Sequence, residues 1–176
     1  MAERVVLRAM GAADLAAYKM LRDGALAERP EAFTSDAAAE MRRPPETYLA
    51  RLSGPADGGW PFTFTAWLGE RLVGAVTCER DARLKVNHIG KIVGMMVEPD
   101  LRGKGIGRAL LEACVGQARE RGLAVLTLTV TSDNAVAIDL YSRMGFVRYG
   151  RLERAIRVGA QFHAKDLMAL DLDKGN

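Results

Sequence analysis

The stretch DLRGKGIGRALL, residues 100–111, places glycines at alternate positions just where an apolar helical pattern begins: Gly103, Gly105 and Gly107. Glycine is costly inside a helix, so this spacing needs an explanation. Glycines between a strand and a helix let backbone N–H groups converge on an anion, and the helix dipole favours negative charge there. The stretch therefore predicts a pyrophosphate cradle rather than a flexible turn. The basic residues interleaved with the glycines add full charges: Arg102, Lys104 and Arg108.

Two nucleotide-binding motifs fit this loop poorly. A Walker A loop requires a Ser or Thr directly after its lysine, and Lys104 is followed by Gly105. A dinucleotide fingerprint has the spacing G-x-G-x-x-G and an acidic residue at the end of the next strand. Here the spacing is G-x-G-x-G, and no such acidic residue follows. ATP and NAD are therefore weak candidates for the anion.

The pattern R-x-x-G-x-G, preceded by MMVEPDL at 95–101, resembles the acetyl-coenzyme A loop of the GNAT N-acetyltransferase superfamily. The stretch TSDNAVAIDLYSRMGF at 131–146 resembles the second signature of that superfamily, and RPEAF at 29–33 is similar to a stretch common in its bacterial members. The predicted strand order also matches, from about Val5 to Leu172. The resemblance implies direct transfer of acetyl from acetyl-CoA, the co-substrate, to a primary amine in a ternary complex.

The resemblance also implies which residues bind the coenzyme. Strand residues contact the pantetheine arm through their main chain: Met95, Met96 and Val97. The N–H of Met96 or Val97 is then the oxyanion donor at the thioester carbonyl, although both methionine side chains can also pack in the core. Backbone N–H groups of the loop hold the pyrophosphate: Arg102, Gly103, Lys104, Gly105, Ile106, Gly107 and Arg108.

Two side chains on the second signature carry further roles by the same resemblance. Asn134 contacts the coenzyme arm, and its alternative is a simple cap or turn residue. Tyr141 is the general acid that protonates the departing thiolate, since a phenol with an ordinary pKa of about 10 is protonated at neutral pH. The alternative for Tyr141 is an aromatic residue that packs on the helix face with Ala137 and Ile138.

The general base is less defined by the sequence. Glu79 is the first candidate, with Asp81 and His88 as weaker ones, and each can instead be a solvated residue at a strand end. A water molecule with no dedicated base is an equal alternative. We expect the acceptor between the 28–46 loop, the central strand and the 157–163 turn, which includes His163. Acidic residues of the loop could steer a cationic amine: Glu31, Asp36 and Glu40.

The whole chain of 176 residues is predicted to form one N-acetyltransferase domain, residues 1–176, with a core of about 4–172. The fold class is α/β, with a mixed, largely antiparallel sheet flanked by helices on both faces. The expected strands are 5–10, 60–68, 71–80, 88–97, 123–130, 146–153 and 162–172. The expected helices are 14–29, 46–52, 106–121 and 134–144, with Asp14 capping the first and Ser132 or Asp133 the last. Residues 28–46 are read as a loop, and 53–59 as a surface turn.

Composition narrows the other options. The chain is 49% hydrophobic and 27% charged, with a net charge of +3, too small to argue for nucleic acid. No signal peptide is recognised, and no apolar run approaches the roughly 20 residues of a membrane span, so we expect a cytoplasmic protein. Cys78 and Cys114 have no metal-ligand spacing and are read as buried hydrophobes, not acyl-enzyme nucleophiles.

We expect the acceptor to be a small-molecule or peptide amine, and the sequence leaves open whether the protein is a monomer or a homodimer. A non-catalytic acyl-CoA sensor is the main alternative.

Overall fold

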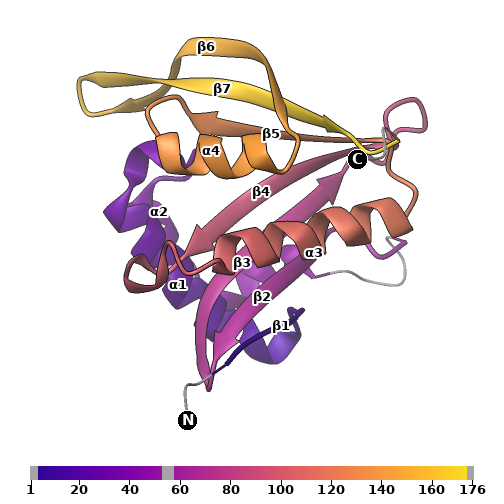
Figure 1. Cartoon of the computed structure of the whole chain (residues 1–176). Coiled ribbons are helices and arrows are strands. Elements are labelled where there is room, and N and C mark those ends of the chain that lie inside the picture. The colour runs from indigo at the N-terminus through magenta and orange to yellow at the C-terminus, as the bar shows by residue number, and fades with distance from the viewer. Residues whose placement is uncertain (1–3, 53–57, 174–176) are drawn as a thin grey trace.

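A computed structural model describes residues 4–52 and 58–173 of the chain. Seven strands form one sheet in the order β1-β2-β3-β4-β5-β7-β6. Every neighbouring pair is antiparallel except β4 and β5, which are parallel and are joined by a crossover helix. Helices cover both faces, with α3 and α4 in front and α1 and α2 behind (Figure 1). The predicted fold class is therefore confirmed.

The elements have the following bounds. The strands are β1 (Val5–Ala9), β2 (Phe62–Leu68), β3 (Arg71–Arg80), β4 (Ile89–Val97), β5 (Val125–Thr131), β6 (Val147–Val158) and β7 (Gln161–Asp171). The α-helices are α1 (Leu15–Glu28), α2 (Ala37–Met41), α3 (Ile106–Glu120) and α4 (Ala135–Arg143). Short helical turns complete the fold: η1 (Ala12–Asp14), η2 (Pro30–Ala32), η3 (Pro45–Arg51) and η5 (Pro99–Leu101).

Two connecting segments differ from the sequence prediction. The 28–46 segment is not a plain loop, because it contains η2 and the short helix α2, which Asp36 caps by accepting from the Ala39 N–H at 2.8 Å. The last hairpin is longer than expected, since β6 pairs with β7 as far as Val158 opposite Gln161. Its turn is therefore only two residues long, and His163 lies on β7 rather than in the turn. The predicted surface turn at 53–59 lies largely outside the described residues.

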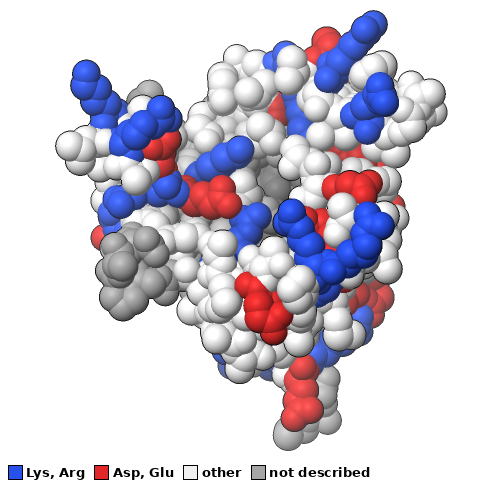
Figure 2. Space-filling model, turned by 180° about the vertical axis from the view of Figure 1, so that it is seen from behind, with Lys and Arg blue, Asp and Glu red and all other residues white. Residues whose placement is uncertain are grey.

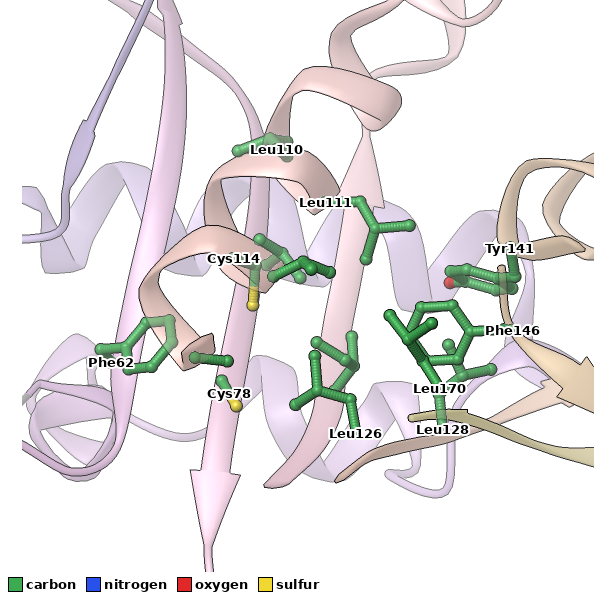
Figure 3. Close-up of a cluster of buried hydrophobic side chains, with 14 of the residues drawn as sticks. Phe62, Cys78, Leu110, Leu111, Cys114, Leu126, Leu128, Tyr141, Phe146 and Leu170 are labelled. Atoms are coloured by element: carbon green, nitrogen blue, oxygen red, sulfur yellow. The ribbon is translucent and has the colours of Figure 1, made fainter. Parts of the chain in front are cut away.

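Helix α3 packs on the front face over a continuous apolar core. Leu110, Leu111 and Cys114 are fully buried there, and they meet β3 and β5 side chains (Figure 3). Cys78 and Cys114 are both free and buried, as the sequence predicted. The hydrogen bond with Cys78, together with burial, raises the pKa of the Cys114 thiol above its usual range. The Cys114 thiol is therefore poorly suited to act as a nucleophile, and Cys78 is fully buried.

The back face is covered by α1 and η3 and contains a second apolar cluster, with Tyr18 and Tyr48 edge to face at 5.2 Å between ring centroids. This layer also buries charge. Glu40 accepts from the Tyr48 hydroxyl at 2.6 Å and lies 3.5 Å from the Arg22 guanidinium. Burial raises the pKa of Glu40, but Tyr48 and the nearby arginines offset this effect and leave that pKa below its ordinary value.

One of the two predicted helix caps is at the expected position and the other is not. Asp14 occupies the N-cap position of α1, as predicted, but its carboxylate binds Arg8 and the Gly11 N–H and makes no capping bond to the helix. For α4 the cap is Asn134, whose Oδ1 accepts from the Ala137 N–H at 3.2 Å. Ser132 is used elsewhere, since its hydroxyl donates to Asp166 at 2.8 Å. The strand β5 extends to Thr131, which moves the helix start one residue later than predicted.

Candidate functional site

The central feature of the site is the separation of β4 from β5. The two strands pair only between residues 89–91 and 125–127, although β4 continues to Val97 and β5 to Thr131. On its other side β4 remains paired with β3 up to Val97 opposite Gly74. The far half of β4 therefore presents a sheet edge in the middle of the molecule, and such an edge can accept an added extended chain.

The hydrogen bonds of β4 indicate which of its N–H groups face this edge. The Glu98 N–H donates to the Val73 oxygen on β3 at 2.9 Å. Because successive residues of an antiparallel ladder point alternately to the two sides, the Val97 N–H faces away from β3. The Met96 N–H, by the same alternation, faces β3. Of the two predicted oxyanion donors, the register thus favours Val97.

The loop between β4 and α3 has the conformation that the glycine spacing suggests. Gly103 has φ +76° and Gly105 has φ +83°, values that side-chain-bearing residues rarely adopt. A Cβ at either position would meet no atom within 4 Å, so the loop is open on its outer side. The first bond of the helix runs from the Ala109 N–H to the Gly105 oxygen. The N–H groups of residues 106–108 precede this ladder and can bind an anion.

Gly107 is required for a different reason. Its φ is not positive, and a Cβ there would lie 3.2 Å from the Met95 side chain and 3.6 Å from those of Leu140 and Val97. A larger residue would therefore push α3 away from β4 and α4. The three alternate glycines thus divide into two that shape the loop and one that permits close packing.

The basic side chains of the loop are partly engaged. Arg102 forms a double ion pair with Glu28 at the end of α1, at 2.7 Å and 2.6 Å, and its Nε donates to the Val97 oxygen. Arg108 pairs with Glu112 one turn along α3. Lys104 is exposed. The charge of Arg102 is therefore used to attach the loop to α1, a role that the sequence did not reveal.

Tyr141 lies on α4 with its ring against Phe146, the centroids 6.0 Å apart. The residue is only 7% exposed, and Figure 3 shows its hydroxyl directed from α4 toward the centre of the molecule. Burial raises the pKa of Tyr141 to about 12, so the phenol retains its proton across the physiological range. The side chain packs in the core, as the alternative interpretation expected, and its hydroxyl also carries a transferable proton.

Asn134 likewise combines a structural role with a free group. Its side-chain Oδ1 caps α4, and its backbone N–H donates to the Thr131 oxygen at 2.9 Å. The simple cap that the sequence left as an alternative is therefore present. The cap uses the oxygen only, so the amide nitrogen of this side chain can still donate to a ligand.

The candidate bases are placed on the back face and at its edge. Glu79 on β3 lies opposite Lys91 on β4, and its carboxylate pairs with Arg51 at 2.7 Å while remaining 44% exposed. Asp81 is a poor base, because hydrogen bonds from Arg83 lower its pKa to about 2. His88 is exposed next to the start of β4. Among these three, Glu79 is the one on the face that α1 covers.

The three carboxylates expected to steer a cationic amine are all engaged. Glu31 pairs with Arg29 at 3.1 Å, Asp36 caps α2, and Glu40 is buried beside Arg22 and Tyr48. Figure 2 shows this side of the molecule, with basic and acidic side chains around a hollow near its middle. The sequence did not reveal the buried Arg22–Glu40 pair, because the two residues lie on separate helices, α1 and α2.

A cavity of about 270 Å³ lies where β5 ends, between the start of α4 and the last hairpin. Thr131, Arg151, Phe162 and His163 are among its lining residues.

Within residues 4–52 and 58–173, His, Cys, Asp and Glu side chains form no group that could hold a metal ion. The same ranges contain no helix of the length and apolarity needed to cross a membrane.

Comparison with known proteins agrees with this geometry. A model of the acetyltransferase (GNAT) family matches residues 20–146. N-alpha-acetyltransferase 30 of Schizosaccharomyces pombe is 35% identical over 96 residues, 54% of this chain and 64% of that protein. The ribosomal protein bS18-alanine N-acetyltransferase of Escherichia coli is 44% identical over 55 residues, 31% of this chain and 37% of that protein. Each alignment thus spans less than two thirds of the relative.

The solved structures extend the likeness to the whole fold. A GNAT acetyltransferase from Streptococcus pneumoniae superposes with a TM-score of 0.80 at 25% identity, covering 96% of this chain and 99% of that one. The protein yncA of Salmonella typhimurium, solved with its cofactor acetyl-CoA, gives a TM-score of 0.79 at 21% identity over 97% of this chain and 95% of that one. With a family match over residues 20–146 and this shared architecture, the chain belongs to the GNAT family of acetyltransferases.

Proposed function

We propose that this protein is an acetyl-CoA-dependent N-acetyltransferase that transfers acetyl directly to a primary amine of a small molecule or peptide. The observation that carries the proposal is the continuity of three features. The free edge of β4 runs into the open loop at Gly103 and Gly105, and the protonated Tyr141 lies across the gap on α4. A thioester with a long arm that ends in a pyrophosphate could extend from Tyr141 along the β4 edge to the glycine loop.

Each group then has a defined task. The N–H groups from Arg102 to Arg108 bind the pyrophosphate, and the far half of β4 pairs with the pantetheine arm at Met95 and Val97, since the Met96 N–H faces β3. The Val97 N–H stabilises negative charge on the carbonyl oxygen, an effect typically worth about 3–4 kcal/mol. Asn134 donates its amide N–H to the coenzyme arm. Acetyl-CoA supplies the activated acetyl thioester.

Proton movement follows from the same arrangement. The attacking amine must lose a proton, and Glu79 accepts it on the face that α1 covers, directly or through water. Tyr141 gives its hydroxyl proton to the departing thiolate and is restored from solvent. The amine nitrogen gains the acetyl group and the sulfur leaves as a thiol, so no acyl-enzyme is needed. The two thiols of the chain, Cys78 and Cys114, are both buried.

Calorimetry on the variant Gly105→Val tests the coenzyme site. At φ +83° a branched side chain strains the backbone by about 1–3 kcal/mol and turns the loop N–H groups away from the phosphates. We expect acetyl-CoA affinity to fall at least about tenfold. Gly116→Ala is the matched control, since Gly116 lies inside α3 with open space around it. Equal affinity in a folded Gly105→Val protein contradicts the proposal.

A non-catalytic acyl-CoA sensor is the second candidate function, because the β4 edge and the loop would serve binding alone equally well. The two functions are separated by thiol release. A panel of primary amines should release coenzyme A from acetyl-CoA if the protein is an enzyme. Tight acetyl-CoA binding with no release for any amine in the panel identifies a sensor.

A further inference from the structure

Two lysines share the back face of the sheet beside the separation of β4 and β5. Lys91 forms the last residue pair between these strands, opposite Thr127. Its neighbour Ile92 packs in the front core, so the alternation of the strand turns Lys91 toward the back. Lys165 on β7 lies opposite Thr131, and its ammonium donates to the Ala32 oxygen of η2 on the same face.

The environment of Lys165 is unusual for a lysine. The residue is 8% exposed, although lysine is rarely buried without a charged partner. Its Nζ has one hydrogen bond, 3.1 Å to the Ala32 oxygen, which leaves two further donors. Burial, and then the charge of Lys91, lower the pKa of Lys165. The two ammonium groups therefore act on one another across the end of the gap.

The nearby carboxylates do not neutralise this pair. Glu79 lies opposite Lys91 across the strands, but its carboxylate is held by Arg51 at 2.7 Å. Asp166, the residue after Lys165, is held by Arg151 at 2.6 Å. Within the described part of the chain, neither Lys91 nor Lys165 forms an ion pair with Asp or Glu. The face thus retains uncompensated positive charge where the acceptor is expected.

We propose that Lys91 and Lys165 select an acceptor that carries a carboxylate on the same molecule as its primary amine. The inference rests on the proposed function and specifies its substrate class. A carboxylate that enters from the back face meets both ammonium groups, and charge-assisted hydrogen bonds of this kind are about twice as strong as neutral ones. The threonines at 127, 129 and 131 lie on the same side of β5. The hydroxyls of Thr127 and Thr131 donate to the Gly90 and Glu31 oxygens, and the exposed Thr129 is a further polar group on this face.

The test compares each amino acid with its own amide. Glycine, β-alanine and 4-aminobutyrate are assayed against glycinamide, β-alaninamide and 4-aminobutyramide, with thiol release as the signal. Amides have less basic amines, so more of the neutral nucleophile is present and the comparison is biased against the proposal. We expect at least one acid to exceed its amide at least about 10-fold in kcat/KM. The chain length that shows the greatest ratio reports the distance between the amine and carboxylate subsites.

Lys91→Gln is the main variant, because Lys91 is exposed and its replacement leaves the fold intact. It should reduce the acid-to-amide ratio about 10-fold while kcat/KM for the amide changes little. Lys85→Gln is the matched control, an exposed lysine in the β3–β4 connection. For the buried position, Lys165→Arg should retain part of the preference and Lys165→Met should lose it, with thermal unfolding recorded for both.

A second series separates two sources of the carboxylate. Peptides with a free N-terminus, an acidic or amide second residue and an amidated C-terminus replace the amino acids. Preference for the acidic peptide assigns the carboxylate to a protein chain, and preference for free amino acids assigns it to a small molecule. Equal use of acids and amides by the wild-type protein overturns the inference and leaves the proposed function intact. Failure of every amine, acid or amide, overturns both.

Discussion

Helices α3 and α1 cover opposite faces of one sheet, yet they bury different chemistry. The buried residues of α3 are Ile106, Leu110, Leu111, Cys114, Val115 and Ala118, whereas α1 buries Arg22 and Tyr18 among its apolar residues and contacts the buried Glu40 of α2. Buried charge is costly unless it is paired and hydrogen-bonded. Apolar packing thus stabilises the front face, while the back face depends on a polar network beside the expected acceptor site.

The largest expected effect concerns the hydroxyl of Tyr141 in the otherwise apolar front core. Tyr141→Phe retains the ring and its contact with Phe146. General acid catalysis contributes about 10²–10⁴-fold, so kcat should fall by that order where thiolate departure limits the rate. Acetyl-CoA affinity should change little, since a neutral hydrogen bond contributes about 1 kcal/mol.

The Tyr141 measurement needs single-turnover kinetics to establish that chemistry limits the rate, with thermal unfolding as the control for folding. Acyl donors with a more acidic thiol should show a smaller loss, because a better leaving group needs less protonation. Wild-type turnover in the variant would make Tyr141 a packing residue and leave the front face purely structural.

The next effect tests the polar network of the back face. Glu40→Ala removes the partner of the buried Arg22 and of the Tyr48 hydroxyl. Breaking a buried pair from one side costs about 3–5 kcal/mol of unfolding free energy. Leu110→Ala, on the front face, should cost about 2–5 kcal/mol through a cavity instead. Urea unfolding at neutral pH measures both.

Acid pH separates the two variants. The folded state lowers the pKa of Glu40 below its ordinary 4.5. Its contribution is therefore complete above the unfolded pKa and is lost as the pH falls through the folded pKa. The cost of Glu40→Ala should shrink when unfolding is repeated below about pH 4, while the cost of Leu110→Ala should stay constant. Parallel pH dependence in both variants would mean that the charge of Glu40 does not stabilise the fold.

Glu79 lies on the back face and should give a smaller, pH-dependent effect. If it accepts the amine proton, Glu79→Gln should lower kcat/KM at least about tenfold and move the acidic limb of the pH–rate profile. Asp81→Asn is the control, because its low pKa of about 2 makes it a poor base. An acidic limb that does not move, at equal stability, assigns proton removal to water.

The smallest expected effect is a gain in stability, on replacing Tyr18 with Phe. Tyr18 is fully buried, and its hydroxyl has no hydrogen-bond partner among the described residues. A buried unsatisfied group costs about 1–3 kcal/mol, so Tyr18→Phe should raise the unfolding free energy by about 1 kcal/mol. Tyr48→Phe, which loses the bond to Glu40, should lower it. A loss of stability in both variants would show that the Tyr18 hydroxyl is satisfied in solution.

Elements with a strong periodic pattern were predictable from the sequence. The alternation at 60–68 predicted β2, the turn at 69–70 predicted β3 at its observed bounds, and the spacing after Gly105 predicted α3. Periodic patterns and turn residues are local features, so a short stretch of sequence is enough to reveal them. The glycine conformations at 103 and 105 were predictable for the same reason, because a turn is a local structure.

Features that depend on distant partners were not predictable. Glu40 was interpreted as a loop acid that could steer a cationic amine, and Asp14 as a helix cap. Each of them instead pairs with an arginine that tertiary packing brings near, Arg22 and Arg8 respectively. Arg102 read as a phosphate ligand, yet Glu28 lies 74 residues away in sequence and binds it. The role of Gly107 depends on Met95, a residue of the preceding strand. A pattern read from one sequence carries no information about contacts between residues that are far apart along the chain.

The short pairing of β4 with β5 has a consequence for how the molecule opens. Among the described residues, the strand pairing that joins β1–β4 to β5–β7 covers 89–91 and 125–127, with His88 adding bonds from the Ala124 and Val125 N–H groups, whereas β5 pairs with β7 over its whole length. The sheet is therefore two smaller sheets held together by a narrow seam and by the side chains packed across it. Native-state hydrogen exchange should resolve them as two cooperative units. A ligand strand laid along β4 would merge their protection into one.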